Sequence, residues 1–315
     1  MIAKRHSRSE KDRRYAVQLD GILNINKPSG ITSMDVIRRV KRASGQKRVG
    51  HGGTLDPLAS GVIPVCIGRA TRLMEYLFSS TKVYLAQVEL GVETDTYDES
   101  GTVLSRHGAS SISLTAFENV LTEFKGRIFQ VPPMYSALKK GGKRLYELAR
   151  KGVVVERKPR EIEVFDLDLI DWSPPIATLY IRCSRGFYVR SLAHDIGQTL
   201  GCGAILKNLV RQKTGPFSLE DSVSLEEFER KSKDGDWADL LSHPDIAIRH
   251  MRAVIVDSEV EDMVGNGRPL PPVLQIPSCR SSEECRVYTK DGVFIAILAF
   301  DSRQKQWKPT RVFSG

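Results

Sequence analysis

A single acidic residue, Asp56, lies in a loop built otherwise from glycine, proline and small or apolar residues, GHGGTLDPLASG at positions 50–61. No other Asp, Glu, Lys or Arg occurs between Arg48 and Arg69. Glycine allows backbone conformations and close approaches that other residues cannot adopt, and Pro57 stiffens the chain directly after the acid. Such a loop can present one carboxylate rigidly to a bulky ligand, for nucleophilic or acid–base chemistry. The alternative is a turn in which Asp56 only caps the next element.

Three further residues could work with this acid. Tyr84 follows the start of an expected strand, and it could either pack in the core or stack on a nucleic-acid base. Arg190 is expected at the start of a helix, where the helix dipole disfavours a cation, so the sequence predicts an acidic partner elsewhere in the chain. His51 is either a turn residue or a contact to a phosphate-rich ligand. The stretch LVRQKT at 209–214 is expected to add basic surface.

Several common chemistries are missing from the sequence. The loop lacks the Gly-Lys-Ser/Thr ending of a P-loop, and the chain contains no GxSxG nucleophile elbow. The five cysteines form no CxxC pair and no zinc-ligand spacing. We therefore expect no cofactor and no metal, and we expect reduced thiols in the cytoplasm. No apolar run approaches the length of a membrane span, so no membrane partner is expected.

The charge of the chain indicates a polyanionic partner. The 315 residues include 47 lysines and arginines against 38 acids, which gives a net charge of +9 and a pI of about 9.3. The basic residues gather in two segments, from Arg38 to Arg48 and from Lys139 to Arg160. Either segment could be a solvated helix face. Two such clusters, together with the acid-poor loop, favour binding to nucleic acid.

Hydrophobic patterns predict the elements that hold these residues. A strand at 22–26 should end in a turn at 27–30, and a helix is expected from Met34 to Ser44. The apolar run from Ser60 to Gly68 predicts a buried strand, followed by a helix that carries Leu73 and Leu77. Further strands are expected at 83–91 and 178–183, and a further helix at 115–124. The result is a mixed α/β domain.

Three segments differ in composition from this domain. Residues 1–20 resemble a disordered basic tail, because little there could be buried. Residues 131–160 are too charged for a core, and they are predicted to form a mobile loop that projects towards a ligand. Past a polar helical stretch after Ser224, residues from about 250 onward predict a small β-rich unit. Its expected strands are 252–256, 286–288, 293–300 and 310–313, with turns at 265–267 and 291–292.

The same motifs, taken together, resemble the TruB family of tRNA pseudouridine synthases. The resemblance begins with GILNINKPSG at 21–30 and the loop at 50–61, and it runs to about Phe217. The order and spacing of so many motifs make a chance match very improbable. The remaining motifs are GRATR at 68–72, KVY at 82–84, GVETDTYD at 91–98, PPMYSA at 132–137, GFYVR at 186–190 and GCGA at 201–204.

The resemblance implies a fold, a reaction and a set of residue roles. The fold is an α+β domain at 21–248 with a mainly antiparallel sheet and an RNA-clamping thumb at 131–160, followed by a PUA-like RNA-binding domain at 249–315. The reaction is the isomerisation of uridine 55 in the tRNA T-loop to pseudouridine. By motif position Asp56 is the nucleophile, Arg190 its ion-pair partner, and Tyr84 the aromatic that stacks on the flipped base. Implied RNA contacts are His51, Tyr188, Leu209, Lys27, Arg211, Lys139, Lys140, Lys143 and Arg144.

Simple physical chemistry agrees with these roles. A base inside a folded loop must leave its stack before a carboxylate can reach it, and a nearby cation such as Arg190 favours the ionised acid. Two alternatives stay open: an RNA chaperone that keeps the fold without turnover, and a guide-RNA-dependent subunit of a multiprotein particle. Intact Asp56, Tyr84 and Arg190 argue against the first, and the long basic segment 131–160 against the second. The expected partner is tRNA, held at the T-arm and, through the C-terminal domain, at the acceptor stem by a monomer.

Overall fold

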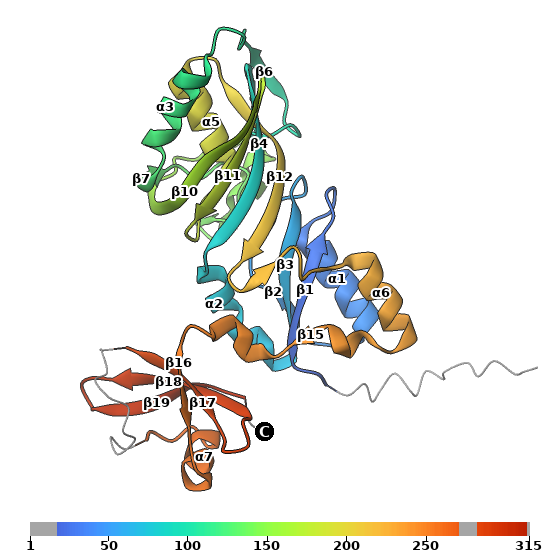
Figure 1. Ribbon diagram of the computed structural model, residues 1–315, viewed down its shortest axis with the longest axis vertical. Helices are drawn as coiled ribbons and strands as arrows, with labels where there is room; N and C mark the ends of the chain where they lie inside the picture. The colour runs from blue at the N-terminus through green and yellow to red at the C-terminus, as the bar shows by residue number, and fades with distance from the viewer. Residues whose placement is uncertain (1–17, 271–281, 314–315) are drawn as a thin grey trace, which may run out of the picture.

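The computed structural model describes residues 18–270 and 282–313 of the chain (Figure 1). Most of the predicted tail at 1–20 therefore lies outside the described residues, but its last residues lie within them. Asp20 accepts hydrogen bonds from the backbone N and the Nε of Arg69 at 2.5 and 2.6 Å. The backbone N of Leu19 donates to Gln46 Oε1 at 3.3 Å. The chain is thus attached to the body at these two residues.

The body is built on an 11-stranded sheet with the principal strand order β14-β1-β3-β12-β4-β11-β10-β7. Among the described strand pairs of this sheet, β1 with β14 and β3 with β12 run parallel, and the others run antiparallel. The predicted mainly antiparallel α/β fold is therefore confirmed. The strands are β1 (Gly21–Lys27), β2 (Val49–His51), β3 (Ser60–Ile67), β4 (Lys82–Leu90), β7 (Gly126–Gln130), β10 (Arg160–Ser173), β11 (Ile176–Cys183), β12 (Ala204–Thr214), β13 (Phe217–Ser218), β14 (Val223–Ser224) and β15 (Leu241–Ser242).

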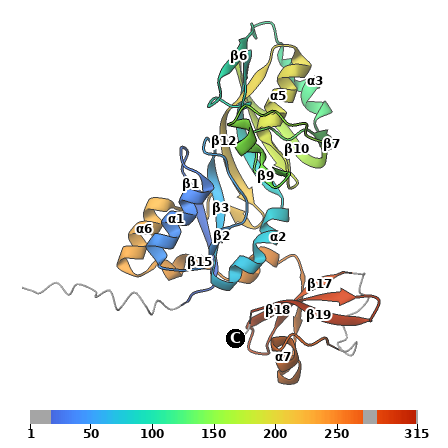
Figure 2. The ribbon, with the colours of Figure 1, turned by 180° about the vertical axis from the view of Figure 1, so that it is seen from behind.

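Helices pack on the sheet in two groups (Figures 1 and 2). The helices α3 and α5 contact each other near β10 and β12, whereas α1 and α6 contact each other beside β1. The first helix begins one residue before the prediction, because Thr32 and Asp35 form a capping box that starts the helix at Ser33. The helices are α1 (Ser33–Ser44), η2 (Gly68–Leu73), α2 (Met74–Ser79), α3 (Leu114–Glu123), α5 (Val189–Leu200), α6 (Leu225–Asp234), η3 (Trp237–Leu240) and η4 (Pro244–Ile248).

Two small hairpins extend from the body. One follows β4 and consists of β5 (Val92–Thr94) and β6 (Val103–Arg106). The other lies inside the segment predicted as a mobile loop at 131–160. It consists of β8 (Lys139–Lys140) and β9 (Lys143–Arg144), followed directly by the short helix α4 (Leu145–Ala149). This segment therefore has regular structure of its own.

The C-terminal part forms a separate four-stranded sheet with a core of its own. Its strand order is β16 (Arg252–Ile255), β17 (Glu284–Tyr288), β18 (Phe294–Asp301) and β19 (Gln306–Val312). The sequence pattern located these strands but missed α7 (Ser258–Gly265), which packs on β18 and β19. This helix has only 8 residues, so its hydrophobic periodicity is weak, and its start is fixed by Asp257, whose side chain accepts from the backbone N of Val260.

Candidate active site

The loop that carries Asp56 connects β2 to β3, two neighbouring strands of the main sheet. At the start of β3, Gly61 has φ of 103° and lies against the backbone of Arg211 in β12. A Cβ atom at Gly61 would stand 2.3 Å from the Arg211 carbonyl oxygen, so only glycine permits this approach. The end of the loop is thereby fixed against the strand at the centre of the sheet.

Buried donors hold the loop from the side of β1 and α1. Lys27 is fully buried, and its Nζ donates to the carbonyl oxygens of Pro28 and Ile31 at 2.9 and 2.8 Å and to that of Pro57 at 3.4 Å. Burial lowers the pKa of Lys27 to about 8. Ser33 Oγ donates to the carbonyl of Leu55 and accepts from its backbone N, at 2.9 and 2.8 Å. The residues on both sides of Asp56 are thus anchored to the fold.

Arg211 holds the opposite side of the loop. Its side chain is 1% exposed, and its guanidinium donates to the carbonyl oxygens of Gly53, Thr54 and Val62 at 3.0, 3.2 and 2.7 Å. The prediction that Arg211 adds basic surface is therefore wrong. β12 lies between β3 and β4, so this side chain points into the protein, where buried carbonyl groups need donors. Arg211 and Lys27 support the loop from within and are not exposed to a ligand.

The structure places Arg190 directly opposite the loop acid. Arg190 Nε lies 2.9 Å from Asp56 Oδ2, and the arginine side chain is 5% exposed while that of Asp56 is 39% exposed. Arg190 lies in the first turn of α5, where the helix dipole offers it no stabilisation. The carboxylate supplies the missing negative charge and remains open to solvent. Asp56 is therefore accessible to a ligand, whereas its partner is fixed behind it.

Arg190 is held by three further groups. Its Nη1 lies 3.6 Å from Asp98 Oδ2 and donates to the Thr96 carbonyl at 3.1 Å, and its Nη2 donates to the Tyr135 carbonyl at 2.7 Å. Asp98 is itself buried, and its Oδ1 accepts from the hydroxyls of Thr96 and Ser100 at 2.6 and 2.5 Å. The guanidinium therefore joins the loop acid, a buried second acid and the segment that begins at Val131.

Tyr84 lies beside this ion pair on β4. It pairs with Arg211 of β12 and with Ile181 of β11, and its side chain is 8% exposed. Burial raises the pKa of Tyr84 to about 12, although the charge of Arg211 opposes the shift. The phenol consequently keeps its proton at neutral pH. The buried ring of Tyr84, with its protonated hydroxyl, thus lies next to the loop that carries Asp56.

The other residues predicted to contact a nucleotide have different environments. His51 ends β2 and is half-buried, and burial together with the charge of Arg211 lowers its pKa. Tyr188 precedes α5 and exchanges two hydrogen bonds with the side chain of Gln130, through its backbone N at 2.8 Å and its carbonyl at 3.0 Å. Leu209 is 6% exposed and belongs to the hydrophobic core. His51 and Tyr188 thus remain partly open to a ligand, whereas Leu209 is almost enclosed.

The two basic clusters differ in how much charge they leave free. Arg39 of α1 pairs with Glu229 of α6 at 2.6 Å, and Arg38 pairs with Asp35 at 2.7 Å, so part of the first cluster is neutralised. In the second cluster the hairpin residues are exposed, and of these Lys140 Nζ donates to the carbonyl of Glu156 at 2.8 Å. The hairpin therefore offers the more available positive charge. Its exposed basic residues are Lys139, Lys140, Lys143 and Arg144.

Comparison with known families agrees with this geometry. Residues 41–189 match the N-terminal domain of the TruB family pseudouridylate synthases, and residues 190–259 match the C-terminal domain of tRNA pseudouridylate synthase B. This chain belongs to the TruB family. A relative from Dehalococcoides mccartyi, named tRNA pseudouridine synthase B, is 45% identical over 94% of this chain and 97% of its own length. A relative of the same name from Clostridium kluyveri is 42% identical over 94% of this chain and 100% of its own length.

Solved structures share the TruB-type fold. A chain of a Cbf5-Nop10-Gar1 complex has a TM-score of 0.71 and 25% identity, over 96% of this chain and 86% of that chain. A chain of an H/ACA RNP bound to a substrate RNA containing 2'-deoxyuridine has a TM-score of 0.72 and 23% identity, over 94% of this chain and 85% of that chain. The second likeness concerns the fold alone.

Sequence reasoning gave no role to two buried charged residues, Asp98 in this TruB-family site and Lys82 at the end of α2. Asp98 ends the motif GVETDTYD, and the hydroxyl residues Thr96 and Ser100 around it were a signal that its carboxylate is hydrogen-bonded. Lys82 begins the motif KVY, and its buried Nζ donates to the carbonyls of Leu77, Phe78 and Ser80 at 3.0, 2.6 and 2.6 Å. For Lys82 the sequence carried no such signal, because its acceptors are backbone groups.

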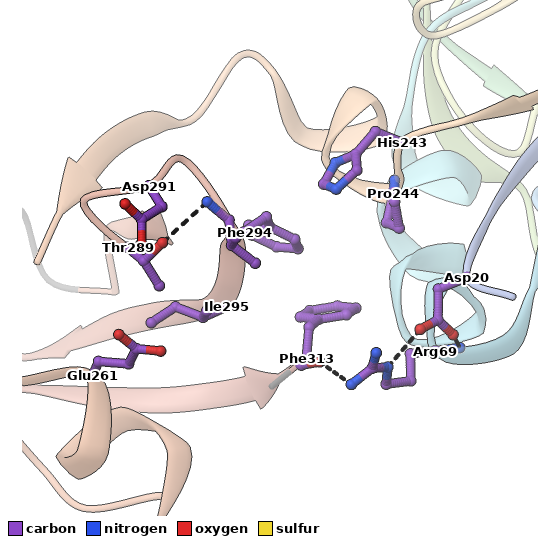
Figure 3. Close-up of a pocket in the computed structure, with 11 residues that line it drawn as sticks. Asp20, Arg69, His243, Pro244, Glu261, Thr289, Asp291, Phe294, Ile295 and Phe313 are labelled. Atoms are coloured by element: carbon purple, nitrogen blue, oxygen red, sulfur yellow. Dashed lines mark hydrogen bonds and ion pairs between the residues drawn. The ribbon is translucent and has the colours of Figure 1, made fainter. Parts of the chain in front are cut away.

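A cavity lies outside this site, where the body meets the C-terminal sheet (Figure 3). It has a volume of about 530 Å³, and its lining includes Asp20 and Arg69 of the body and the rings of Phe294 and Phe313. Arg69 also donates to the carbonyl of Phe313 across this boundary. Within residues 18–270 and 282–313, no cluster of three or more His, Cys, Asp or Glu side chains could hold a metal ion. No helix in these ranges is long and apolar enough to cross a membrane.

Proposed function

We propose that this protein isomerises uridine 55 in the T-loop of tRNA to pseudouridine, with Asp56 as the nucleophile. The observation that carries the proposal is the 2.9 Å contact between Asp56 and the almost fully buried Arg190. A cation fixed behind a solvent-open carboxylate holds that carboxylate in one position and leaves its other side free for attack on a ligand. Membership of the TruB family and the name tRNA pseudouridine synthase B of close relatives support the same reaction.

The target base has to leave its stack to reach Asp56, and Tyr84 is suited to receive it. Its ring stacks on the flipped uracil, and its hydroxyl keeps its proton at neutral pH, since burial raises the pKa of Tyr84 to about 12, so it can donate a hydrogen bond to the base. Arg211 and Lys27 hold the loop in place without contacting the base. No cofactor is required, because breaking and rejoining the glycosidic bond within one nucleotide involves no net oxidation or reduction.

RNA is held by two regions outside the loop. The segment 131–160 acts as a thumb whose exposed hairpin contacts phosphates, and the PUA-like unit at 249–315 contacts the acceptor stem. The exposure of the hairpin cations and the separate C-terminal sheet support these assignments. If both contacts form, full-length tRNA binds more tightly than an isolated T-arm stem-loop. The protein acts as a monomer in the cytoplasm and needs no protein partner.

The decisive experiment uses the purified chain alone with an unmodified tRNA transcript that carries tritium at C5 of uracil. Release of tritium into water reports isomerisation. Asp56→Asn should abolish release, while its affinity for tRNA stays within a few-fold of the unaltered protein, because phosphate contacts come from other residues. Turnover by the variant above background would remove Asp56 from the nucleophile role. RNA binding by the unaltered protein without release would favour a chaperone, and release that depends on an added guide RNA would favour the guide-dependent branch.

A further inference from the structure

An exposed aromatic side chain, Phe78, lies at the rim of the active-site loop. Phe78 belongs to the end of α2 and is 43% exposed. Its ring centroid lies 6.2 Å from that of His51, with an interplanar angle of 63°. The two rings thus meet edge to face at the start of the loop that carries Asp56. Exposed apolar residues are common on protein surfaces, so the informative feature of Phe78 is its contact with His51 beside the loop.

The backbone that carries Phe78 is held rigidly against the loop. A Cβ atom at Gly52 would stand 2.5 Å from Leu77 Cβ, so the loop and α2 are in direct contact. The carbonyl of Phe78 accepts from the buried Lys82 Nζ at 2.6 Å. Leu77 is fully buried, whereas the next residue along the helix, Phe78, faces solvent. The ring is therefore presented to solvent on a fixed support, as a binding surface requires.

The surroundings of this ring suit a nucleic acid. Arg185 is exposed, and its Nη1 donates to the hydroxyl of Ser79, the residue next to Phe78, at 3.3 Å. A cation beside an exposed ring provides a contact for phosphate next to a surface for a base. Burial and the charge of Arg211 lower the pKa of His51, so this rim disfavours a charged imidazole beside Phe78.

We propose that Phe78, supported by His51, is a stacking platform for an unpaired base that neighbours the flipped uridine in the RNA. The proposal rests on the proposed function, because it requires an RNA loop at the site. Base flipping leaves the neighbouring bases without a stacking partner, and an aromatic ring at the rim replaces that partner. Tyr84 cannot serve both bases, because it is 8% exposed and lies at the floor of the site. Phe78 is thus a positioning residue for the RNA.

Substitutions at Phe78 separate stacking from simple apolar contact. Stacking on an aromatic side chain typically contributes enough to change affinity by roughly 5- to 150-fold. Phe78→Ala and Phe78→Leu should therefore weaken tRNA binding by an amount in this range. Phe78→Trp keeps an aromatic ring and should bind tRNA about as tightly as the unaltered protein. Single-turnover rates at saturating RNA should stay close to those of the unaltered protein in all three. The matched control is Leu104→Ala, which removes an apolar side chain that is 67% exposed on β6, and it should change neither quantity.

A second measurement identifies the base. Each nucleotide of a T-arm stem-loop is replaced in turn by an abasic residue, and binding is measured for the unaltered protein and for Phe78→Ala. At one loop position the abasic change should weaken binding to the unaltered protein but cost the variant little, which shows direct coupling. Additive losses at every position would overturn the proposal, as would full affinity of Phe78→Leu. Failure of the proposed function has a different signature, since the unaltered protein would then release no tritium from any RNA.

Discussion

Arg190 Nε lies 2.9 Å from Asp56 Oδ2, and the two side chains differ sharply in exposure, 5% against 39%. The same guanidinium also reaches the buried Asp98 and the carbonyl of Tyr135. One buried cation thus connects the acid of the loop, a second acid and the base of the thumb segment. Because each of these groups constrains the arginine, the geometry of Asp56 depends on residues far from it in sequence.

Removing this cation should damage both catalysis and stability. Arg190→Ala should lower turnover by roughly 100-fold or more, as loss of a preorganised electrostatic partner commonly does. It should also lower the free energy of unfolding by about 3 kcal/mol, because Asp98 would stay buried without its cation. Urea unfolding and tritium release measure the two effects. Arg182→Ala is the control, since Arg182 makes only surface contacts, an ion pair with Asp166 and a cation–π contact with Phe165, and its loss should lower stability much less. Full activity in Arg190→Ala would contradict the role of the pair.

Tyr84 variants should separate its ring from its hydroxyl. Tyr84→Phe keeps the stacking surface, so tRNA affinity should stay close to that of the unaltered protein, while turnover should fall about 100-fold if the hydroxyl transfers a proton. Tyr84→Leu loses both properties and should be slower still. The measurement is the single-turnover rate at saturating RNA. Equal and undiminished rates in both variants would exclude Tyr84 from the chemistry.

The thumb hairpin should control affinity more than chemistry. Replacing Lys139, Lys140, Lys143 and Arg144 together by alanine should weaken tRNA binding and flatten its salt dependence. Each lost phosphate contact should reduce the slope of log affinity against log salt by roughly 0.7–0.9. Alanines at Arg230, Lys231 and Lys233 of α6 are the control. They remove three basic side chains, of which Arg230 is paired with Glu227 and Asp234, and they should change the slope much less. An unchanged slope in the hairpin variant would mean that its charges are only a solvated surface.

The buried Lys82 should make stability depend on alkaline pH. Burial lowers its pKa from the ordinary 10.5 to about 8, so between these values the unfolded chain binds more protons than the folded one. The contribution of Lys82 to the free energy of unfolding therefore rises with pH through this window and is constant below it. Between about pH 7.5 and about pH 10, the free energy of unfolding of the unaltered protein should rise by about 1–3 kcal/mol relative to that of Lys82→Met. Urea unfolding at the two pH values measures this gain.

Lys47→Met provides the control for that experiment, because Lys47 is exposed on the surface. The free energy of unfolding of Lys47→Met should differ from that of the unaltered protein by the same amount at both pH values. If the Lys82→Met difference also stays constant, the ammonium group of Lys82 is not buried in solution, and the hydrogen bonds to the end of α2 would need another explanation.

Much of the site was visible in the sequence because it depends on local patterns. The isolated acid at position 56, the glycines around it and the alternation around Tyr84 are properties of short segments, and they predicted the loop and the strand that the structure contains. The helix dipole argument also predicted that Arg190 needs an acidic partner. These inferences succeed because backbone conformation and amphipathic spacing are set by neighbouring residues.

Only the tertiary structure decided which charges are buried and which remain available. Arg211 lies in a basic stretch that reads as surface, but β12 runs between β3 and β4, so its guanidinium is enclosed and binds the loop carbonyls. Phe78 shows the converse, an apolar residue left exposed beside His51. Whether a side chain is buried depends on the order in which strands and helices pack, and that order is set by contacts between distant segments. No local pattern contains this information, so the sequence identified Asp56 as the candidate acid and the fold determined its surroundings.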